Sequence, residues 1–123
     1  MNAQCDSASV PVSSWRSARL FVTDEFAAPP VILRVDDSVI GTLGNFSAST
    51  GKAKSKKTFN VCAIVAAAMT GGTVLNYSAS LPPEKRRILY VDTEQSRFHC
   101  KRVLCRILRL AGLPTDVHPP LLE

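Results

Sequence analysis

The sequence lacks the features of a membrane-spanning or secreted protein. Its longest apolar run, Val61 to Met69, is about half of the roughly 18 residues that a membrane-spanning helix needs. The first residues, MNAQCDSASVPVSS, have neither a basic start nor an apolar core, so they do not resemble a secretion signal. We therefore expect a protein that makes no membrane contact and resides in the cytoplasm.

The cysteines lack the spacing of a metal site. Cys5, Cys62, Cys100 and Cys105 form no CxxC pair and have no histidine at the spacing of a zinc ligand. If residues 97–111 are helical, Cys100 and Cys105 lie about 140° apart around the helix axis, which does not favour a disulfide. We favour the interpretation that all four are small core or half-exposed thiols rather than ligands.

A large excess of one charge is also missing. The 15 Lys and Arg residues against 10 Asp and Glu residues leave a net charge of +5 over 123 residues. An excess of this size suits an anionic partner such as a nucleotide or a nucleic acid, but it is modest for a dedicated DNA-binding protein. With 46% hydrophobic and 20% charged residues, the composition is that of an ordinary globular domain with a core.

The composition divides the chain into three regions. Residues 1–30 mix Ser, Ala and Pro with few periodic apolar residues, which predicts a flexible leader. Residues 31–112 carry regular patterns and form the predicted domain. Residues 113–123 have no pattern of their own and are interpreted as a tail or a truncation point, because Gly112 and Pro114 end the preceding helix.

The patterns within residues 31–112 predict an α/β fold. The expected elements are a hairpin at 31–43, a strand at 45–50, a helix at 58–69, a strand at 88–91 and a helix at 98–111. The segment NFSAST at 45–50 is more polar than a buried parallel strand usually is, but a phosphate-binding loop must follow a strand. Gly71 and Gly72 end the first helix.

The octet GKAKSKKT is the most specific motif in the chain. A phosphate-binding loop (Walker A motif) has glycine, four free positions, and then Gly-Lys-Ser/Thr; here Gly51, Lys57 and Thr58 are in register, and Lys56 replaces the second glycine. Lys57 would contact the phosphates of a nucleotide, and the Thr58 hydroxyl would bind the magnesium ion. The expected nucleotide-binding residues are those of the loop: Gly51, Lys52, Ala53, Lys54, Ser55, Lys56, Lys57 and Thr58.

Two carboxylates follow the predicted strand at 88–91. Strand ends and phosphate loops meet at one edge of an open α/β sheet, so Glu94 is predicted to lie near the loop and to orient or deprotonate an attacking water. Asp92 is a rival as an acidic residue that contacts magnesium. The alternative is that both residues cap the following helix, and we favour this alternative for Asp92 but not for Glu94.

These motifs resemble a known family. The pattern Gly51-x-x-Lys54-x-x-Lys57-Thr58, followed by ILYVDTEQS and a basic amphipathic helix, is similar to RecA-like P-loop ATPases of the RepA helicase group, a set of AAA family ATPases. VIGTLGNF and GKAKSKKTF look closest to members carried by bacterial mobile elements and plasmids.

The resemblance covers roughly residues 31–112 and implies a partial RecA-like core with an incomplete parallel sheet. It implies ATP and Mg²⁺ as ligands, with Lys57 and Glu94 catalytic and Thr58 as the metal ligand. It also implies a ring-forming homo-oligomer that uses ATP hydrolysis to move on or unwind DNA during replication or mobilisation. The later strands of that core do not match this chain, so we expect the N-terminal fragment of a longer ATPase or a truncated gene.

Two other interpretations remain open. The chain could be a non-enzymatic nucleic-acid-binding fragment that uses Lys52, Lys54, Lys56, Lys57 and the basic face from Lys101 to Arg109. Such binding would weaken steeply with salt and would be indifferent to ATP. The third interpretation is an inactive remnant in which the lysine run is only a solvated surface.

Overall fold

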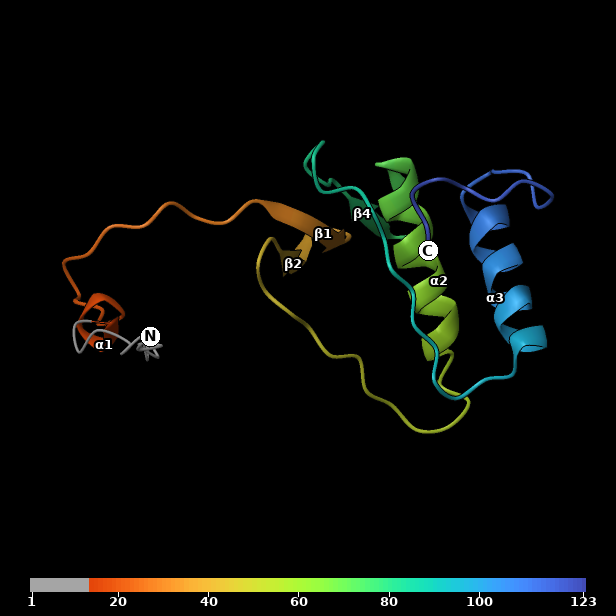
Figure 1. Cartoon of the computed structure of the whole chain (residues 1–123), viewed down its shortest axis with the longest axis horizontal. Coiled ribbons are helices and arrows are strands. Elements are labelled where there is room, and N and C mark those ends of the chain that lie inside the picture. The colour runs from red at the N-terminus through yellow and green to blue at the C-terminus, as the bar shows by residue number, and fades with distance from the viewer. Residues whose placement is uncertain (1–13) are drawn as a thin grey trace, which may run out of the picture.

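The computed structural model describes residues 14–123, so the first 13 residues, with Cys5 and the start of the predicted leader, lie outside the described part. Figure 1 shows the arrangement of the chain. The elements are α1 (Ser14–Ser17), β1 (Val31–Val35), β2 (Ser38–Thr42), α2 (Lys57–Thr70), β3 (Thr73–Val74), β4 (Tyr77–Ala79) and α3 (Arg97–Leu110).

Four strands form one antiparallel sheet in the order β2-β1-β4-β3. The hairpin predicted at 31–43 is present: β1 and β2 pair across a tight turn at Asp36, whose φ of 49° lies in the left-handed region that aspartate tolerates. A second hairpin, β3–β4, joins the first because β4 pairs with β1, with Leu33 opposite Ala79. The Asp36 N–H donates to the Asn76 carbonyl at 2.9 Å and ties the two turns together.

The predicted partial RecA-like core with its incomplete parallel sheet is wrong, because every strand pair in the sheet is antiparallel. Residues 45–50 form no strand and are exposed, which agrees with their polar composition: they offer no apolar face that a sheet could bury. The predicted strand at 88–91 is reduced to one isolated parallel bridge between Ile88 and Leu122.

This bridge nevertheless fixes the course of two distant segments. The N–H of Ile88 donates to the Leu121 carbonyl at 2.8 Å, and the N–H of Tyr90 donates to the Glu123 carbonyl at 2.8 Å. Ile88 and Tyr90 pack against the core beside α2, and Leu122 is buried within it. The segment from Ile88 therefore runs along α2 and passes its N-terminal end before it enters α3 (Figure 1).

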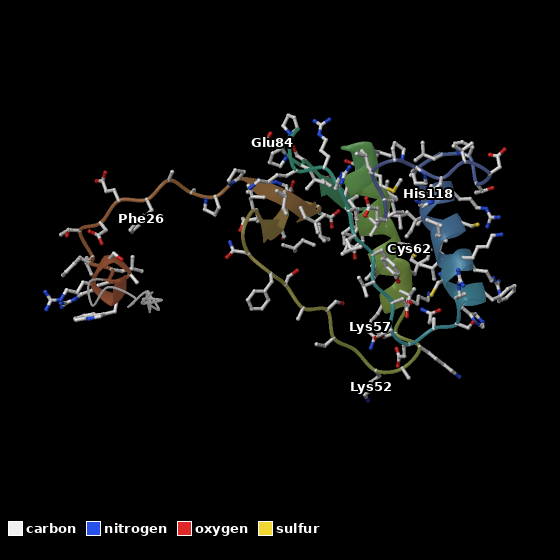
Figure 2. All side chains as sticks on the ribbon, viewed as in Figure 1. Phe26, Lys52, Lys57, Cys62, Glu84 and His118 are labelled. Carbon is white, nitrogen blue, oxygen red and sulfur yellow. The ribbon has the colours of Figure 1, made fainter. Side chains whose placement is uncertain are left out.

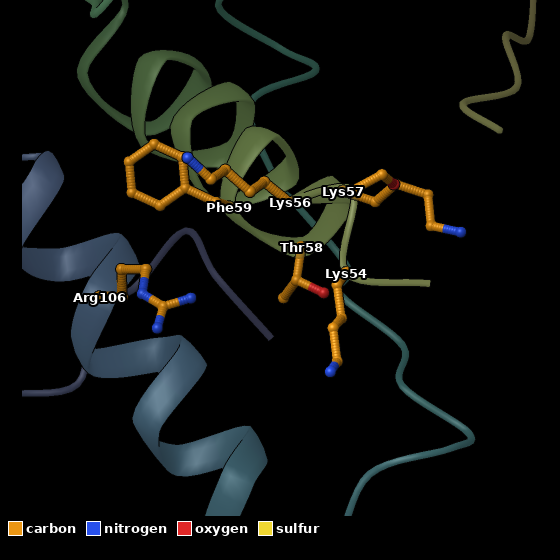
Figure 3. Close-up of a pocket in the computed structure, with 7 residues that line it drawn as sticks. Lys54, Lys56, Lys57, Thr58, Phe59 and Arg106 are labelled. Atoms are coloured by element: carbon orange, nitrogen blue, oxygen red, sulfur yellow. The ribbon is translucent and has the colours of Figure 1, made fainter. Parts of the chain in front are cut away.

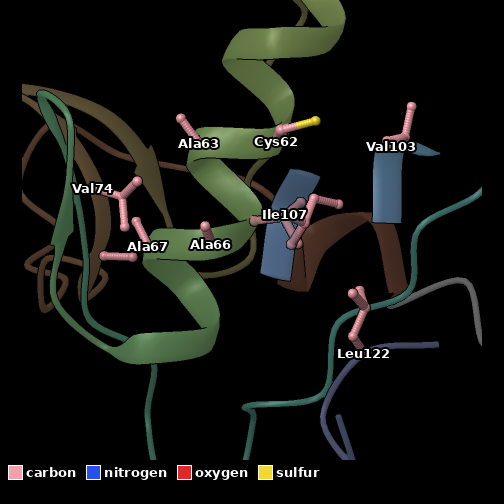
Figure 4. Close-up of a cluster of buried hydrophobic side chains, with 10 residues drawn as sticks. Cys62, Ala63, Ala66, Ala67, Val74, Val103, Ile107 and Leu122 are labelled. Atoms are coloured by element: carbon pink, nitrogen blue, oxygen red, sulfur yellow. The ribbon is translucent and has the colours of Figure 1, made fainter. Parts of the chain in front are cut away.

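Helix α2 is the centre of the molecule and lies between the sheet and α3 (Figure 1). Its buried residues are mostly small, and Figure 4 shows Val74 on one side of them and Val103, Ile107 and Leu122 on the other. Small side chains let a helix approach neighbours on both sides. The helix ends as predicted at Gly71, whose φ of 65° is left-handed and whose N–H donates to the Ala67 carbonyl at 2.9 Å.

Helix α3 confirms the predicted amphipathic helix. Val103, Ile107 and Leu108 are buried at the spacing of one helical face, and the basic residues lie on other faces. Ile107 is 1% exposed, and complete burial of such a side chain contributes about 1.5–3 kcal/mol. Contacts between α2 and α3 therefore hold the basic helix at a fixed position beside the lysine loop.

Two long segments of the described chain lie on the surface. Residues 15–30 are exposed throughout, and Figure 2 shows the Phe26 side chain standing apart from the rest of the molecule. Residues 44–57 are exposed as well. No helix within residues 14–123 is long and apolar enough to cross a membrane.

Candidate functional site

The octet Gly51–Thr58 forms a tight exposed loop that opens α2. The Ser55 N–H donates to the Lys52 carbonyl at 3.2 Å, which closes a turn inside the loop. Lys54 and Lys56 both have left-handed backbones, with φ of 64° and 59°. Ser55, between them, does not have a positive φ. A backbone that alternates between right-handed and left-handed conformations directs neighbouring N–H groups to one side, and such concave segments bind anions.

Gly51 lies close to the Ser55 side chain across the turn of the loop. A Cβ at this position would lie 2.6 Å from the Ser55 Oγ and 3.2 Å from the Ser55 Cβ. The Gly51 carbonyl accepts a hydrogen bond from the Lys57 ammonium group at 2.6 Å. A side chain at residue 51 would push Ser55 away and widen the loop.

Lys57 is the first residue of α2, and its side chain folds back over the loop to reach Gly51. An ammonium group has three N–H donors, and the bond to Gly51 uses one of them. Within residues 14–123 the structure contains one ion pair, between Arg87 and Glu123 at 4.0 Å. The positive charges of the loop therefore have no carboxylate within ion-pairing distance in that part of the chain.

The N-terminus of α2 has no side-chain cap. Lys56 occupies the N-cap position, makes no side-chain capping bond, and contributes its carbonyl to the Asn60 N–H at 3.1 Å. The N–H groups of the first helical turn have no partner within the helix, and together they carry the positive end of the helix dipole. Lys56 and Phe59 both line the cavity described below (Figure 3).

These residues surround an open cavity of ≈ 650 Å³ (Figure 3). Its lining consists of Lys54, Ser55, Lys56, Lys57, Thr58, Phe59 and Arg106. Five of the eight predicted binding residues thus meet at one cavity, whereas Gly51, Lys52 and Ala53 do not line it. Thr58 is half-buried in the first turn of α2, and its hydroxyl lies on the side of Lys54 (Figure 3).

Neither Asp92 nor Glu94 lines the cavity at the loop. The Asp92 carboxylate accepts hydrogen bonds from the N–H groups of Gln95 at 2.9 Å and Glu94 at 3.0 Å. These two backbone bonds, that of Gln95 first, lower the pKa of Asp92 below its ordinary value. Asp92 thus closes the turn that precedes α3, whereas Ser96 occupies the N-cap of that helix, so the helix cap that we favoured for Asp92 is wrong. Glu94 is exposed and does not line the cavity.

Comparisons with protein-family models, curated proteins and solved structures find no match for this chain. The chemistry of the site therefore rests on its own residues. An open cavity with three lysines, one arginine and an uncapped helix N-terminus attracts anions. Among residues 14–123 no group of three His, Cys, Asp or Glu side chains is placed to hold a metal ion by itself.

Arg106 lies at the loop, whereas the sequence analysis placed it only on the basic face from Lys101 to Arg109. It comes from α3, far from the loop in sequence, and it enters the cavity because α3 packs against α2. Its guanidinium also lies near Cys62: burial raises the pKa of the Cys62 thiol, and the positive charge of Arg106 opposes that rise. The sequence carried one signal for this position. Arg106 directly precedes Ile107, so it lies at the border of the buried face of α3, where it can reach a neighbouring helix.

Proposed function

We propose that residues 51–58 bind the phosphate groups of ATP, with Mg²⁺, and that the chain is the ATP-binding segment of a cytoplasmic ATPase that acts in replication or mobilisation of DNA. The observation that supports this most directly is the Lys57 ammonium group, 2.6 Å from the Gly51 carbonyl, across a loop that opens an uncapped helix. The antiparallel sheet means that this proposal rests on the loop and not on a RecA-like core. Assembly into a ring remains a prediction.

The loop residues can contact phosphate in two ways. Lys57 can exchange the neutral Gly51 carbonyl for charged phosphate oxygens, which form stronger hydrogen bonds with an ammonium group. The free N–H groups at the start of α2 add donors that point along the helix dipole. Lys54 and Lys56 raise the positive potential at the cavity wall without any carboxylate in its lining.

The donor set suits a magnesium ion that arrives with the nucleotide. Magnesium prefers hard oxygen ligands and commonly combines one or two protein oxygens with phosphate oxygens and water. Thr58 lines the cavity, and its hydroxyl is the oxygen ligand we assign to the ion. When bound, the ion would neutralise charge on the phosphates.

Glu94 is proposed to orient the attacking water. Because Glu94 does not line the cavity, its carboxylate must move toward the cavity to reach that water.

The Lys57→Ala substitution tests phosphate binding. Loss of a charged hydrogen-bond donor should weaken binding of Mg-ATP about 10- to 100-fold, measured by isothermal titration calorimetry. Lys85→Ala is the matched control: it removes the same charge from an exposed position near Glu84, at the far end of α2 from Lys57 (Figure 2). Equal ATP affinity in the wild type and Lys57→Ala would contradict the proposal.

A second candidate function is nucleic-acid binding by the outer face of α3. A groove of ≈ 550 Å³ there is lined by Phe98, Lys101, Arg102, Cys105, Arg106 and Arg109. Four cations beside an aromatic ring suit a polynucleotide backbone and a stacked base.

Binding of a single-stranded oligonucleotide should weaken with salt, with a slope near −0.7 per neutralised phosphate on logarithmic axes. Arg109→Ala should remove roughly one phosphate contact and so make the slope shallower by about 0.7. ATP should not change the affinity for the oligonucleotide. A salt-independent affinity would rule out this candidate.

A further inference from the structure

The cavity at the loop has a second wall that the phosphate contacts do not use. Phe59 contributes this wall from α2, and Arg106 contributes it from α3 (Figure 3). Both residues belong to the same cavity as Lys57 and Thr58. The volume of ≈ 650 Å³ lies within the range of about 300–1,000 Å³ that is typical of small-molecule sites. The cavity therefore has room for more than a phosphate group.

Helix geometry places Phe59 and Arg106 on the same side of the contact between α2 and α3. Phe59 and Cys62 are three residues apart in α2 and so share one face of that helix. Arg106 lies close enough to Cys62 for its charge to affect the pKa of the thiol. The guanidinium is thus beside the helical face that carries the Phe59 ring, and the two side chains border the cavity from opposite helices (Figure 3).

Both side chains offer a flat surface to a ligand. Phe59 is 38% exposed as a residue although it sits next to a packed helix interface. The Arg106 guanidinium is planar, and a planar cation stacks on aromatic rings. Within residues 14–123 Arg106 has no carboxylate at ion-pairing distance that would occupy it.

We propose that the purine base of the bound nucleotide stacks between the Phe59 ring and the Arg106 guanidinium. This inference rests on the proposed function, because it requires phosphates at Lys57. It adds the residues that hold the base. Stacking depends on the π-surface of the base rather than on its hydrogen-bonding edge, so ATP and GTP should bind with similar affinity.

The test separates the base from the phosphates by comparing Mg-ATP with magnesium tripolyphosphate, which has no base. Two substitutions keep the charge of the site: Phe59→Leu removes the ring, and Arg106→Lys removes the planar surface. The controls make the same changes at exposed positions that line neither this cavity nor the groove on α3: Phe26→Leu and Arg86→Lys. Affinities are measured by calorimetry on the full chain.

We expect Phe59→Leu and Arg106→Lys each to weaken Mg-ATP binding about 3- to 10-fold and to leave tripolyphosphate binding within about twofold. The control variants should bind both ligands as the wild type does. Unchanged tripolyphosphate affinity also shows that each variant is folded at the loop.

Two results would overturn the inference while the phosphate proposal stands. In the first, the wild type binds tripolyphosphate as tightly as ATP. In the second, each substitution leaves ATP affinity unchanged or weakens both ligands equally. If the wild type binds neither ligand, or if Lys57→Ala changes neither affinity, the proposed function fails and the inference fails with it.

Discussion

Lys56 holds a left-handed backbone at the junction between the loop and α2, with φ of 59°. A residue with a Cβ pays about 1–2 kcal/mol in that conformation, whereas glycine does not. The structure thus explains how a lysine replaces the glycine of the phosphate-loop pattern: its backbone takes the left-handed conformation that glycine adopts readily.

A comparison of Lys56→Gly with Lys56→Ala tests this reading, because both substitutions remove the same charge. We expect the glycine variant to be more stable than the alanine variant by about 0.5–1 kcal/mol, measured by urea unfolding. Lys52 provides the control, since its φ is not positive: there the glycine variant should be the less stable one. The same order at both positions would contradict the assigned backbone conformation.

Asp92 makes the stability of the entry into α3 dependent on pH. Its carboxylate accepts two backbone N–H groups, and its pKa in the folded state is lowered. A lowered pKa contributes stability that is fully present above the unfolded-state pKa and is lost as the pH falls through the folded-state value.

The substitution Asp92→Asn keeps an oxygen acceptor but removes this titration. We therefore expect the free energy of unfolding to differ between the wild type and Asp92→Asn at neutral pH, and the difference to shrink as the pH falls below about 4. Urea unfolding at a series of pH values measures it. A difference that stays constant down to pH values of about 2 would show that ionisation of Asp92 does not stabilise the fold.

At the scale of elements, α2 is buried on two sides, and its small residues make that possible. Ala66 is 0% exposed within the core cluster. A larger side chain there must displace packed neighbours, which usually costs about 1–3 kcal/mol.

We expect Ala66→Leu to lower the free energy of unfolding by that amount, measured by urea or thermal unfolding. Asn60→Leu on the exposed part of the same helix is the control and should change stability by less than about 0.5 kcal/mol. If the two variants were equally stable, α2 would not be packed between the sheet and α3.

The elements also show what the sequence could predict. The hairpin and both long helices were found because their signals are local: a turn at Asp36 between two β-rich runs, and apolar residues at helical spacing with glycine at the ends. The β3–β4 hairpin was missed because its strands are short, at Thr73–Val74 and Tyr77–Ala79, and its turn has a left-handed leucine, Leu75, in place of glycine.

At the scale of the whole molecule, strand direction could not be read from the residues. The parallel sheet was inferred from the order of elements and from the family that the loop resembles. The actual sheet depends on pairing between β1 and β4, which are far apart in the sequence. The site shows the same limit: the loop residues were predicted from one octet, whereas Arg106 reaches the cavity only through the packing of α3 on α2.

Between Thr42 and Lys57 the chain crosses the surface with no strand or helix, and it exposes Lys52 and Lys54 there. Exposed basic residues in such a segment are preferred cleavage sites for a trypsin-like protease. A cut at Lys54 would leave two fragments that still share one sheet, because β1 on the first pairs with β4 on the second. The nicked protein would keep Lys57 and Thr58 on the second fragment but lose their covalent connection to Gly51.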